Sequence, residues 1–203
     1  MKKLFILGDS ISIHYRPFLA GMTKGAYSFE INEREKAIAE YDLDNPMGLN
    51  GGDSSSVLAK LTDYQSKGLL DYDVMLLNCG LHDIKRDKQT NEYQVPIELY
   101  CKNLQKIAAL LGSQPGKLCW VRITPVEDER HNSRAKFNRY AADVELYNAA
   151  ADKIMREAGA GIIDLYGFSK NLGGEIFVDH VHYSETARAQ QAAFIAGYIW
   201  PLK

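Results

Sequence analysis

The chain has 203 residues, of which 46% are hydrophobic and 25% charged, and its formal net charge at pH 7 is -2. This length suits one domain with a full buried core, so we expect a single domain over residues 1–203. The near-balance of acidic and basic residues argues against the basic surface of a protein that binds nucleic acid or an anionic membrane.

The amino-terminal segment has two lysines followed by four apolar residues and superficially resembles a secretory leader. The apolar run is too short for a signal peptide. No run of about 18 apolar residues is present, so we expect no membrane span. As the sequence stands we expect a cytoplasmic protein, or a secreted one if a leader has been removed.

The chain begins with a short buried strand over residues 4–7, which Gly8 ends. Apolar residues spaced three or four apart predict a helix over residues 11–24. Residues 27–32 alternate apolar and polar positions, as an edge strand does. Residues 33–50 are charged and resemble a loop, and their pattern predicts no secondary structure.

The middle of the chain continues with a helix that includes residues 57–64 and a buried strand over residues 74–77. The next helix is expected from about residue 92 to residue 111. Pro96 would lie near its first turn, where a missing N–H costs little.

The last part of the chain opens with a strand over residues 118–123 and a polar run over residues 127–138. A long helix over residues 140–155 and a strand over residues 162–165 follow. A final helix is terminated by Pro201.

Strands and helices therefore alternate along the whole chain. Parallel strands need crossover connections of this size, so the pattern predicts an α/β fold. We expect three layers, with helices on both faces of a five-stranded parallel sheet. The order of the strands cannot be obtained from the pattern.

Polar clusters occur just after strands or just before helices, at residues 8–12, 50–54, 80–83 and 179–182. In a doubly wound sheet these ends lie on one side of the molecule. We therefore expect four segments that are distant in sequence to converge on one cleft.

Ser10 has two interpretations, as a helix N-cap or as a nucleophile. Taken alone, the serine is more often a cap. A serine nucleophile needs a base within hydrogen-bond reach and an acid that orients the base. His182 and Asp179 are three positions apart in a loop, a spacing that lets one turn bring their side chains together. Histidine suits the role of base because its pKa lies near neutral pH.

The four polar clusters resemble the sequence blocks of the SGNH hydrolases, also called GDSL esterases and lipases. Residues 8–11 (Gly-Asp-Ser-Ile) are similar to the nucleophile block, with Ile11 in place of leucine. Residues 50–54 are similar to the second block and residues 179–182 to the Asp-x-x-His block. Residues 80–83 match the third block, Gly-x-Asn-Asp, except that His82 replaces the asparagine. All four in order are a strong signal, although each one alone is weak.

The resemblance implies a flavodoxin-like fold and ester hydrolysis through an acyl-enzyme, without a cofactor. It implies that Ser10 is the nucleophile, His182 the base and Asp179 its orienting acid. It assigns the oxyanion hole to Ser10, Gly52 and His82. An asparagine amide always has N–H donors, whereas a neutral imidazole has one, so His82 serves only if its N–H points into the hole.

Other polar residues have weaker claims. His14, one turn past Ser10, and Asp83 are possible pocket residues, although a helix-surface histidine and a loop-holding aspartate are the ordinary interpretations. Arg130 would rim the pocket and favour a polar or anionic substrate, although the arginines of residues 127–139 would by default form a solvated face. His131 is expected to be solvated.

A metal site at residues 179–182 lacks a usual zinc spacing, so we expect no metal and a packing or surface role for His180.

The sequence thus favours a serine esterase that cleaves short acyl groups, such as acetyl groups on carbohydrate. Its partner would be a small-molecule or saccharide ester. Lysophospholipid or thioester hydrolysis and acyl transfer use the same triad and stay open. A non-catalytic binding module of this fold is a further alternative, favoured by the change at His82. A nucleotide-binding protein is disfavoured because neither G-x-G-x-x-G nor a P-loop occurs.

Overall fold

The computed structural model describes residues 1–29, 33–43 and 45–202. Its centre is a parallel five-stranded sheet in the order β2-β1-β3-β4-β5. The strands are β1 (Lys2–Leu7), β2 (Tyr27–Ser28), β3 (Val74–Leu77), β4 (Lys117–Val121) and β5 (Gly161–Ile163). This is the flavodoxin-like order. The expected fold class is confirmed.

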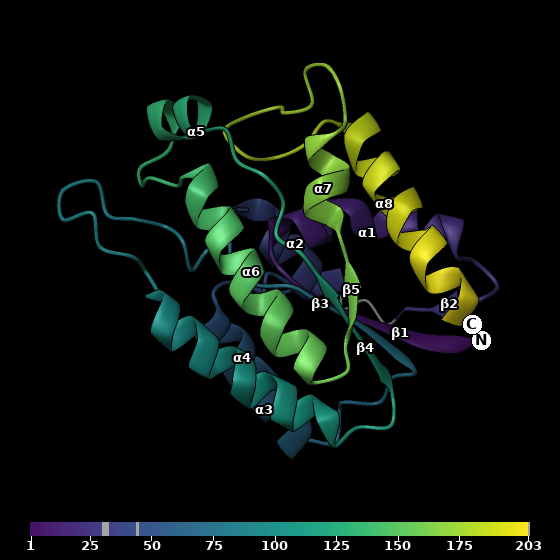
Figure 1. The fold of residues 1–203 in the computed structure, drawn as a ribbon. Helices are drawn as coiled ribbons and strands as arrows, with labels where there is room; N and C mark the ends of the chain where they lie inside the picture. The colour runs from purple at the N-terminus through teal and green to yellow at the C-terminus, as the bar shows by residue number, and fades with distance from the viewer. Residues whose placement is uncertain (30–32, 44, 203) are drawn as a thin grey trace.

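Helices cover both faces of the sheet (Figure 1). They are α1 (Ser10–Met22), α2 (Glu33–Tyr41), α3 (Ser54–Ser66), α4 (Ile97–Gly112), α5 (Asp128–Arg134), α6 (Ala141–Glu157), α7 (Leu165–Lys170) and α8 (Glu185–Ile199), and a 3-10 turn, Trp200–Leu202, ends the chain. Helices α1, α7 and α8 pack together on one face, and α3, α4 and α6 pack together on the other. The result is three layers.

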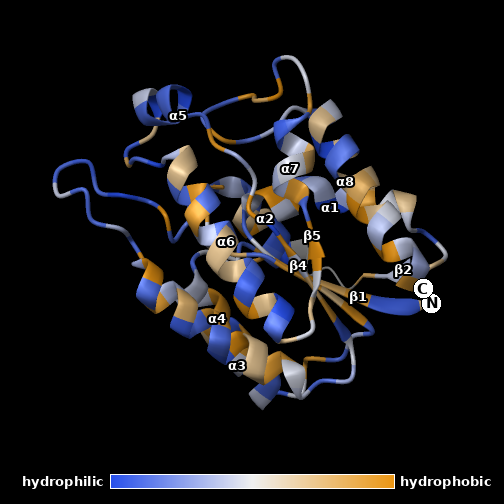
Figure 2. Cartoon of the chain, in the orientation of Figure 1, coloured by the Kyte–Doolittle hydropathy of each residue, from blue (hydrophilic) through white to orange (hydrophobic). Residues whose placement is uncertain are grey.

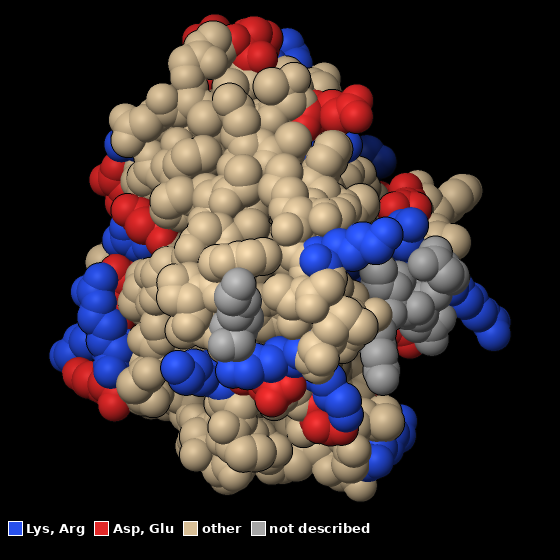
Figure 3. All heavy atoms as spheres, turned by 90° about the vertical axis from the view of Figure 1, so that its right-hand side faces the viewer, with Lys and Arg blue, Asp and Glu red and all other residues tan. Residues whose placement is uncertain are grey.

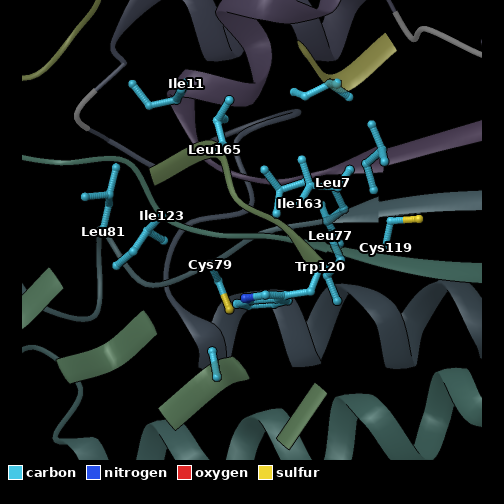
Figure 4. Packing of buried hydrophobic residues seen from close by; sticks show 14 of the residues in the cluster. Leu7, Ile11, Leu77, Cys79, Leu81, Cys119, Trp120, Ile123, Ile163 and Leu165 are labelled. Atoms are coloured by element: carbon cyan, nitrogen blue, oxygen red, sulfur yellow. The ribbon is translucent and has the colours of Figure 1, made fainter. Parts of the chain in front are cut away.

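The core lies between the sheet and these two helical layers. All four residues of β3 are buried, and the middle of the sheet is coloured mostly as hydrophobic in Figure 2, whereas β1 begins with the hydrophilic Lys2 and Lys3. Leu7, Leu77 and Trp120 share one register row across β1, β3 and β4. The Trp120 ring extends from β4 toward a layer of helices (Figure 4). The rigid sheet therefore fixes where the loops at its carboxyl edge begin.

Several element boundaries differ from the expectations. Residues 33–41 form α2 instead of a loop, and α5 forms within the polar run, because short polar helices lack the apolar stripe on which the expectation depended. Helix α4 begins at Ile97, since Pro96 is its extended N-cap. Strand β5 stops at Ile163 and the next residues turn into α7. The expected strand over residues 27–32 is observed at Tyr27–Ser28, and residues 30–32 lie outside the described residues.

The two chain ends lie close together. Lys2 Nζ donates to the Leu202 carbonyl at 2.7 Å, and Tyr27 Oη donates to the Ile199 carbonyl at 2.8 Å. On the side where the ends lie, Lys and Arg side chains form a broken band with Asp and Glu beside them (Figure 3). In the described part of the chain, no helix has the length and apolar character needed to cross a bilayer.

Candidate active site

The candidate site lies at the carboxyl edge of the sheet, beside β1 and β3. The strand order changes direction here, and open α/β sheets bind ligands at such a point. Gly51 N–H donates to the Gly8 carbonyl at 2.7 Å, so the loop before α3 joins the loop after β1. A Cβ at Gly8 would lie 3.2 Å from the Asn78 Cβ, so the loop after β3 is close as well. Three of the four polar clusters thus converge.

Ser10 is the first residue of α1, and it is not the cap. The N-cap is Asp9, whose Oδ1 accepts the Ile11 N–H at 3.0 Å. The N-cap interpretation of Ser10 is therefore wrong, and the cap is Asp9. Because Asp9 caps the helix, the Ser10 hydroxyl is available for another partner. Its backbone N–H, at the first position of the helix, has no intrahelical acceptor.

The fourth cluster supplies that partner. Ser10 Oγ lies 2.9 Å from His182 Nε2, although the two residues are 172 positions apart. His182 Nδ1 lies 2.7 Å from Asp179 Oδ2. The structure therefore brings Ser10, His182 and Asp179 into one continuous hydrogen-bonded chain. Ser10 and His182 are both buried, with 6% and 3% exposure.

Asp179 is held in place by its own loop. Its Oδ1 accepts the backbone N–H groups of Val181 and His182, both at 2.8 Å. Partial burial raises the pKa of this carboxyl, but the hydrogen bonds from the His182 ring and the two N–H groups outweigh burial and hold the pKa well below its usual range. The lowered pKa favours the anionic form of Asp179 at neutral pH.

The two expected oxyanion donors outside α1, Gly52 and His82, lie in different loops. Gly52 has φ +75, and its N–H donates to Asn50 Oδ1 at 3.1 Å. Asn50 Nδ2 in turn donates to the Leu43 carbonyl at 3.1 Å. The Gly52 N–H is thus occupied within its own turn. His82 is buried, at 2% exposure, in the loop after β3.

Asp83 joins the third cluster to the second. Both of its carboxylate oxygens accept the Ser54 N–H at 3.0 Å, at the start of α3. Burial raises the pKa of Asp83 to about 7, and the hydrogen bonds from Ser54 oppose that rise. Asp83 therefore holds the loop that carries His82 against the loop that carries Gly52, as a loop-holding aspartate would, and its bonds are not directed toward Ser10.

His14 lies beside the base. Its ring meets the His182 ring edge-on, with 5.1 Å between centroids. Burial, together with the charges of Arg188 and His182, lowers the pKa of His14 to about 3. A neutral ring at this position packs against His182 without adding a positive charge.

The polar run of residues 127–139 is less solvated than expected. His131 is fully buried and its ring lies 4.9 Å from that of His180, so the expectation for His131 was wrong. Arg139 is also buried, and its Nε donates to the Leu81 carbonyl at 2.6 Å, next to His82. The charged sequence of residues 127–139 does not indicate that His131 and Arg139 are buried.

Arg130 does not present a free guanidinium to the site. Its Nε donates to Glu127 Oε2 at 2.7 Å, and its Nη2 donates to Glu175. The guanidinium also lies 5.6 Å from the centre of the Phe177 ring. These contacts join α5 to the loop that carries Asp179, and the anionic-substrate role expected for Arg130 stays a prediction.

Asn50, whose Oδ1 accepts the N–H of the expected oxyanion donor Gly52, was given no role of its own from the sequence. An Asn two positions before a glycine with positive φ is the available signal, since Asx side chains accept a backbone N–H two residues on.

Over residues 1–29, 33–43 and 45–202, no three His, Cys, Asp or Glu side chains are grouped so as to hold a metal ion.

No family model and no curated protein matches the sequence. Solved structures do match over nearly the whole chain. A lipase/acylhydrolase from Enterococcus faecalis is 17% identical, with a TM-score of 0.70 over 98% of this chain and 95% of that one. A GDSL-like lipase from Bacteroides thetaiotaomicron is 15% identical, with a TM-score of 0.69 over 98% and 88%. An acetylxylan esterase from Geobacillus stearothermophilus is 13% identical, with a TM-score of 0.68 over 99% and 94%. The chain therefore has the three-layer fold of the GDSL-type lipases and esterases.

Proposed function

We propose that this protein is a serine esterase that hydrolyses short acyl esters, with acetyl esters of carbohydrate as the substrate class. The observation that carries the proposal is the chain Ser10 Oγ–His182–Asp179, with successive distances of 2.9 and 2.7 Å. These contacts are the ones that ester hydrolysis by a serine requires.

Ser10 Oγ attacks the ester carbonyl carbon while His182 Nε2 takes the hydroxyl proton. The tetrahedral intermediate collapses, the bond to the alkoxy oxygen breaks, and His182 returns the proton to the leaving alcohol. Water then attacks the acyl-enzyme and loses a proton to His182. The bond to Ser10 Oγ breaks, His182 returns this proton to Oγ, and the carboxylic acid leaves. Asp179 keeps the proton of the neutral imidazole on Nδ1 and stabilises the imidazolium in both halves.

The oxyanion of each intermediate would receive N–H groups from Ser10, Gly52 and His82. For Gly52 this means that the oxyanion competes with Asn50 Oδ1 for one N–H. A developing negative charge is the stronger acceptor, because hydrogen bonds to ionised groups are about twice as strong as neutral ones.

The carbohydrate assignment is supported by two of the structural neighbours, which are acetyl xylan esterases. Other neighbours are a lipase/acylhydrolase and a GDSL-like lipase, so lysophospholipid or thioester hydrolysis is the second candidate. Acyl transfer would use the same three residues with a different acceptor.

The decisive test is labelling by a fluorophosphonate probe, which reacts with an activated serine. We expect wild-type protein to be labelled and Ser10→Ala and His182→Ala to be unlabelled, with Ser12→Ala as a labelled control. Labelling that persists in Ser10→Ala would contradict the proposal. An absence of labelling in folded wild-type protein would favour a non-catalytic module.

A panel of nitrophenyl esters with acyl chains of about 2 to 12 carbons then separates the candidates. Highest kcat/KM at two carbons supports the short-acyl proposal, whereas a maximum at eight or more supports the lipase alternative. Release of acetate from acetylated xylan, compared with acetylated amino alcohols, tests the carbohydrate class.

His82 is tested separately. His82→Ala should lower kcat by about 10²-fold, the loss typical of one oxyanion donor. His82→Asn should retain more activity, since the amide supplies N–H donors at the same position. Equal rates for wild type and His82→Ala would remove His82 from the oxyanion hole.

A further inference from the structure

The inner side of α1 carries a buried cation that the proposed chemistry does not use. Arg16 has 5% exposure, and its Nη2 donates to the Ile6 carbonyl at 2.8 Å. Its Nε is sealed from solvent and has no hydrogen-bond partner. Among the described residues no carboxylate forms an ion pair with it. Besides burial, the groups that act on the pKa of Arg16 are Tyr15 and Tyr64, whose phenols are neutral at pH 7.

An unpaired buried arginine is unusual for a physical reason. A guanidinium stays protonated in proteins, so it cannot escape the cost of burial by losing its charge. Buried charges are ordinarily paired with an opposite charge. The acceptor of Arg16 among the described residues is the neutral carbonyl of Ile6. In this part of the chain the positive charge therefore has no anionic partner.

Arg16 lines a cavity of about 800 Å³. The cavity runs along β1, where, among the described residues, β2 pairs with Lys2 and Lys3. Its walls include Phe5, Leu7 and Leu49. The volume falls in the range of small-molecule sites. Ser10, Asp179 and His182 are not among the lining residues, so this cavity is separate from the triad.

The other charged residues of the cavity are of both signs. Lys3 and Asp71 pair with each other, and their side chains are largely exposed, at 52% and 73%. Glu35 also lines the cavity, and the groups whose pKa it influences are Lys60 and Tyr64. Arg16 is thus the buried charge of the cavity.

We propose that this cavity binds an organic carboxylate with an apolar chain, the carboxylate seated on Arg16 and the chain against Phe5 and Leu49. The planar guanidinium matches a carboxylate in geometry and charge. The apolar walls favour a ligand that removes hydrocarbon from water. An inorganic anion would leave these walls bare, and a neutral lipid would leave the charge of Arg16 without an opposite charge.

The test titrates octanoate into the full chain by calorimetry and records NMR contacts between its methylene protons and the rings of Phe5 and Tyr64. We expect binding of octanoate to be at least about tenfold tighter than binding of octan-1-ol or acetate. Arg16→Gln should weaken octanoate binding by about tenfold or more, since a charge-assisted pair is lost. Arg16→Lys should weaken it less.

Arg16 also holds the Ile6 carbonyl, so Arg16→Gln could fail to fold. Leu49→Trp is the second variant, because it fills the cavity and leaves Arg16 intact. It should weaken octanoate binding while the unfolding temperature stays near that of wild type. Protein labelled at Ser10 by fluorophosphonate should bind octanoate as unlabelled protein does.

Several results would overturn the proposal. These are no octanoate binding to folded wild type, equal binding by folded Arg16→Gln, equal binding by Leu49→Trp, or loss of binding after labelling of Ser10. The last would place octanoate at the triad. None of these results depends on whether the protein hydrolyses esters, so this site and the esterase proposal fail separately.

Discussion

Asp179→Asn probes how the triad is oriented, since it changes charge and hydrogen-bonding pattern at constant size. If the amide oxygen stays on the N–H groups of Val181 and His182, the amide NH₂ faces His182 Nδ1. That nitrogen must then accept, so the imidazole carries its proton on Nε2 and cannot take the proton of Ser10. If the amide flips, its NH₂ faces two N–H donors that now lie 2.8 Å from Asp179 Oδ1.

The magnitude follows from these contacts. Flipping the amide breaks two hydrogen bonds worth about 1 kcal/mol each. The tautomer with its proton on Nδ1, which can accept the Ser10 proton, therefore falls to a few per cent of molecules, a loss of about 30-fold. Removing the carboxylate withdraws its attraction for the imidazolium, about 4 kcal/mol at an effective dielectric of 20. Asp179 is 42% exposed, so we halve this figure, which adds about another 30-fold. The expected fall in kcat is about 10³-fold.

The assay is hydrolysis of nitrophenyl acetate by wild type and Asp179→Asn, with circular dichroism to confirm folding. Glu129→Gln, an amide change at an exposed residue of α5, is the matched control and should leave kcat unchanged. A fall of less than tenfold in folded Asp179→Asn would contradict this prediction, because it would mean that the carboxylate neither selects the tautomer nor stabilises the imidazolium.

Two further predictions concern stability. The pKa of Asp83 is raised to about 7, chiefly by burial, so between about pH 4 and pH 7 the folded chain holds a proton that the unfolded chain releases. The free energy of unfolding should therefore fall by up to about 4 kcal/mol as pH rises through this window. In Asp83→Asn, a plot of unfolding temperature against pH should lack this fall. The same plot for Asp83→Asn and wild type would contradict the prediction. Gly8→Ala should lower the free energy of unfolding in urea by about 1–3 kcal/mol, because the new Cβ would lie 2.9 Å from the Ser12 Cβ and 3.2 Å from the Asn78 Cβ. Gly21→Ala, which meets nothing within 4 Å, is the control and should not destabilise; equal behaviour of the two variants would argue against the steric account.

The parts of the fold that were predictable have strong periodic signals. Strand β3 is an unbroken apolar run between polar residues, and α6 presents Val144, Tyr147 and Met155 on one buried face. Such patterns report burial directly, because one face of each element must be apolar. The strand order was not predictable, because the apolar pattern of a buried parallel strand does not show which strand lies beside it.

The missed features depend on tertiary contacts. Helix α5 is polar throughout, and its buried residue His131 packs against Phe137 and against His180, which is far along the chain. Ser10 and Asp9 show the same limit at short range. Both are good caps, and only the placement of His182 near Ser10 reveals why the aspartate caps while the serine does not. Sequence blocks predicted which residues would converge, but not that Asn50 would occupy the Gly52 N–H.

Asp179 and His182 belong to one loop, closed by the bonds of Val178 N–H to the His182 carbonyl and of Ser184 N–H to the Ile176 carbonyl. Ser10 belongs to a helix at the opposite end of the chain. A displacement of the loop as a rigid unit would keep the carboxylate on the imidazole while separating the imidazole from the hydroxyl. Such a displacement would break or stretch the contact of Arg130 in α5 with Glu175 in this loop. A movement of this one loop could therefore separate His182 from Ser10 while the rest of the fold stays intact.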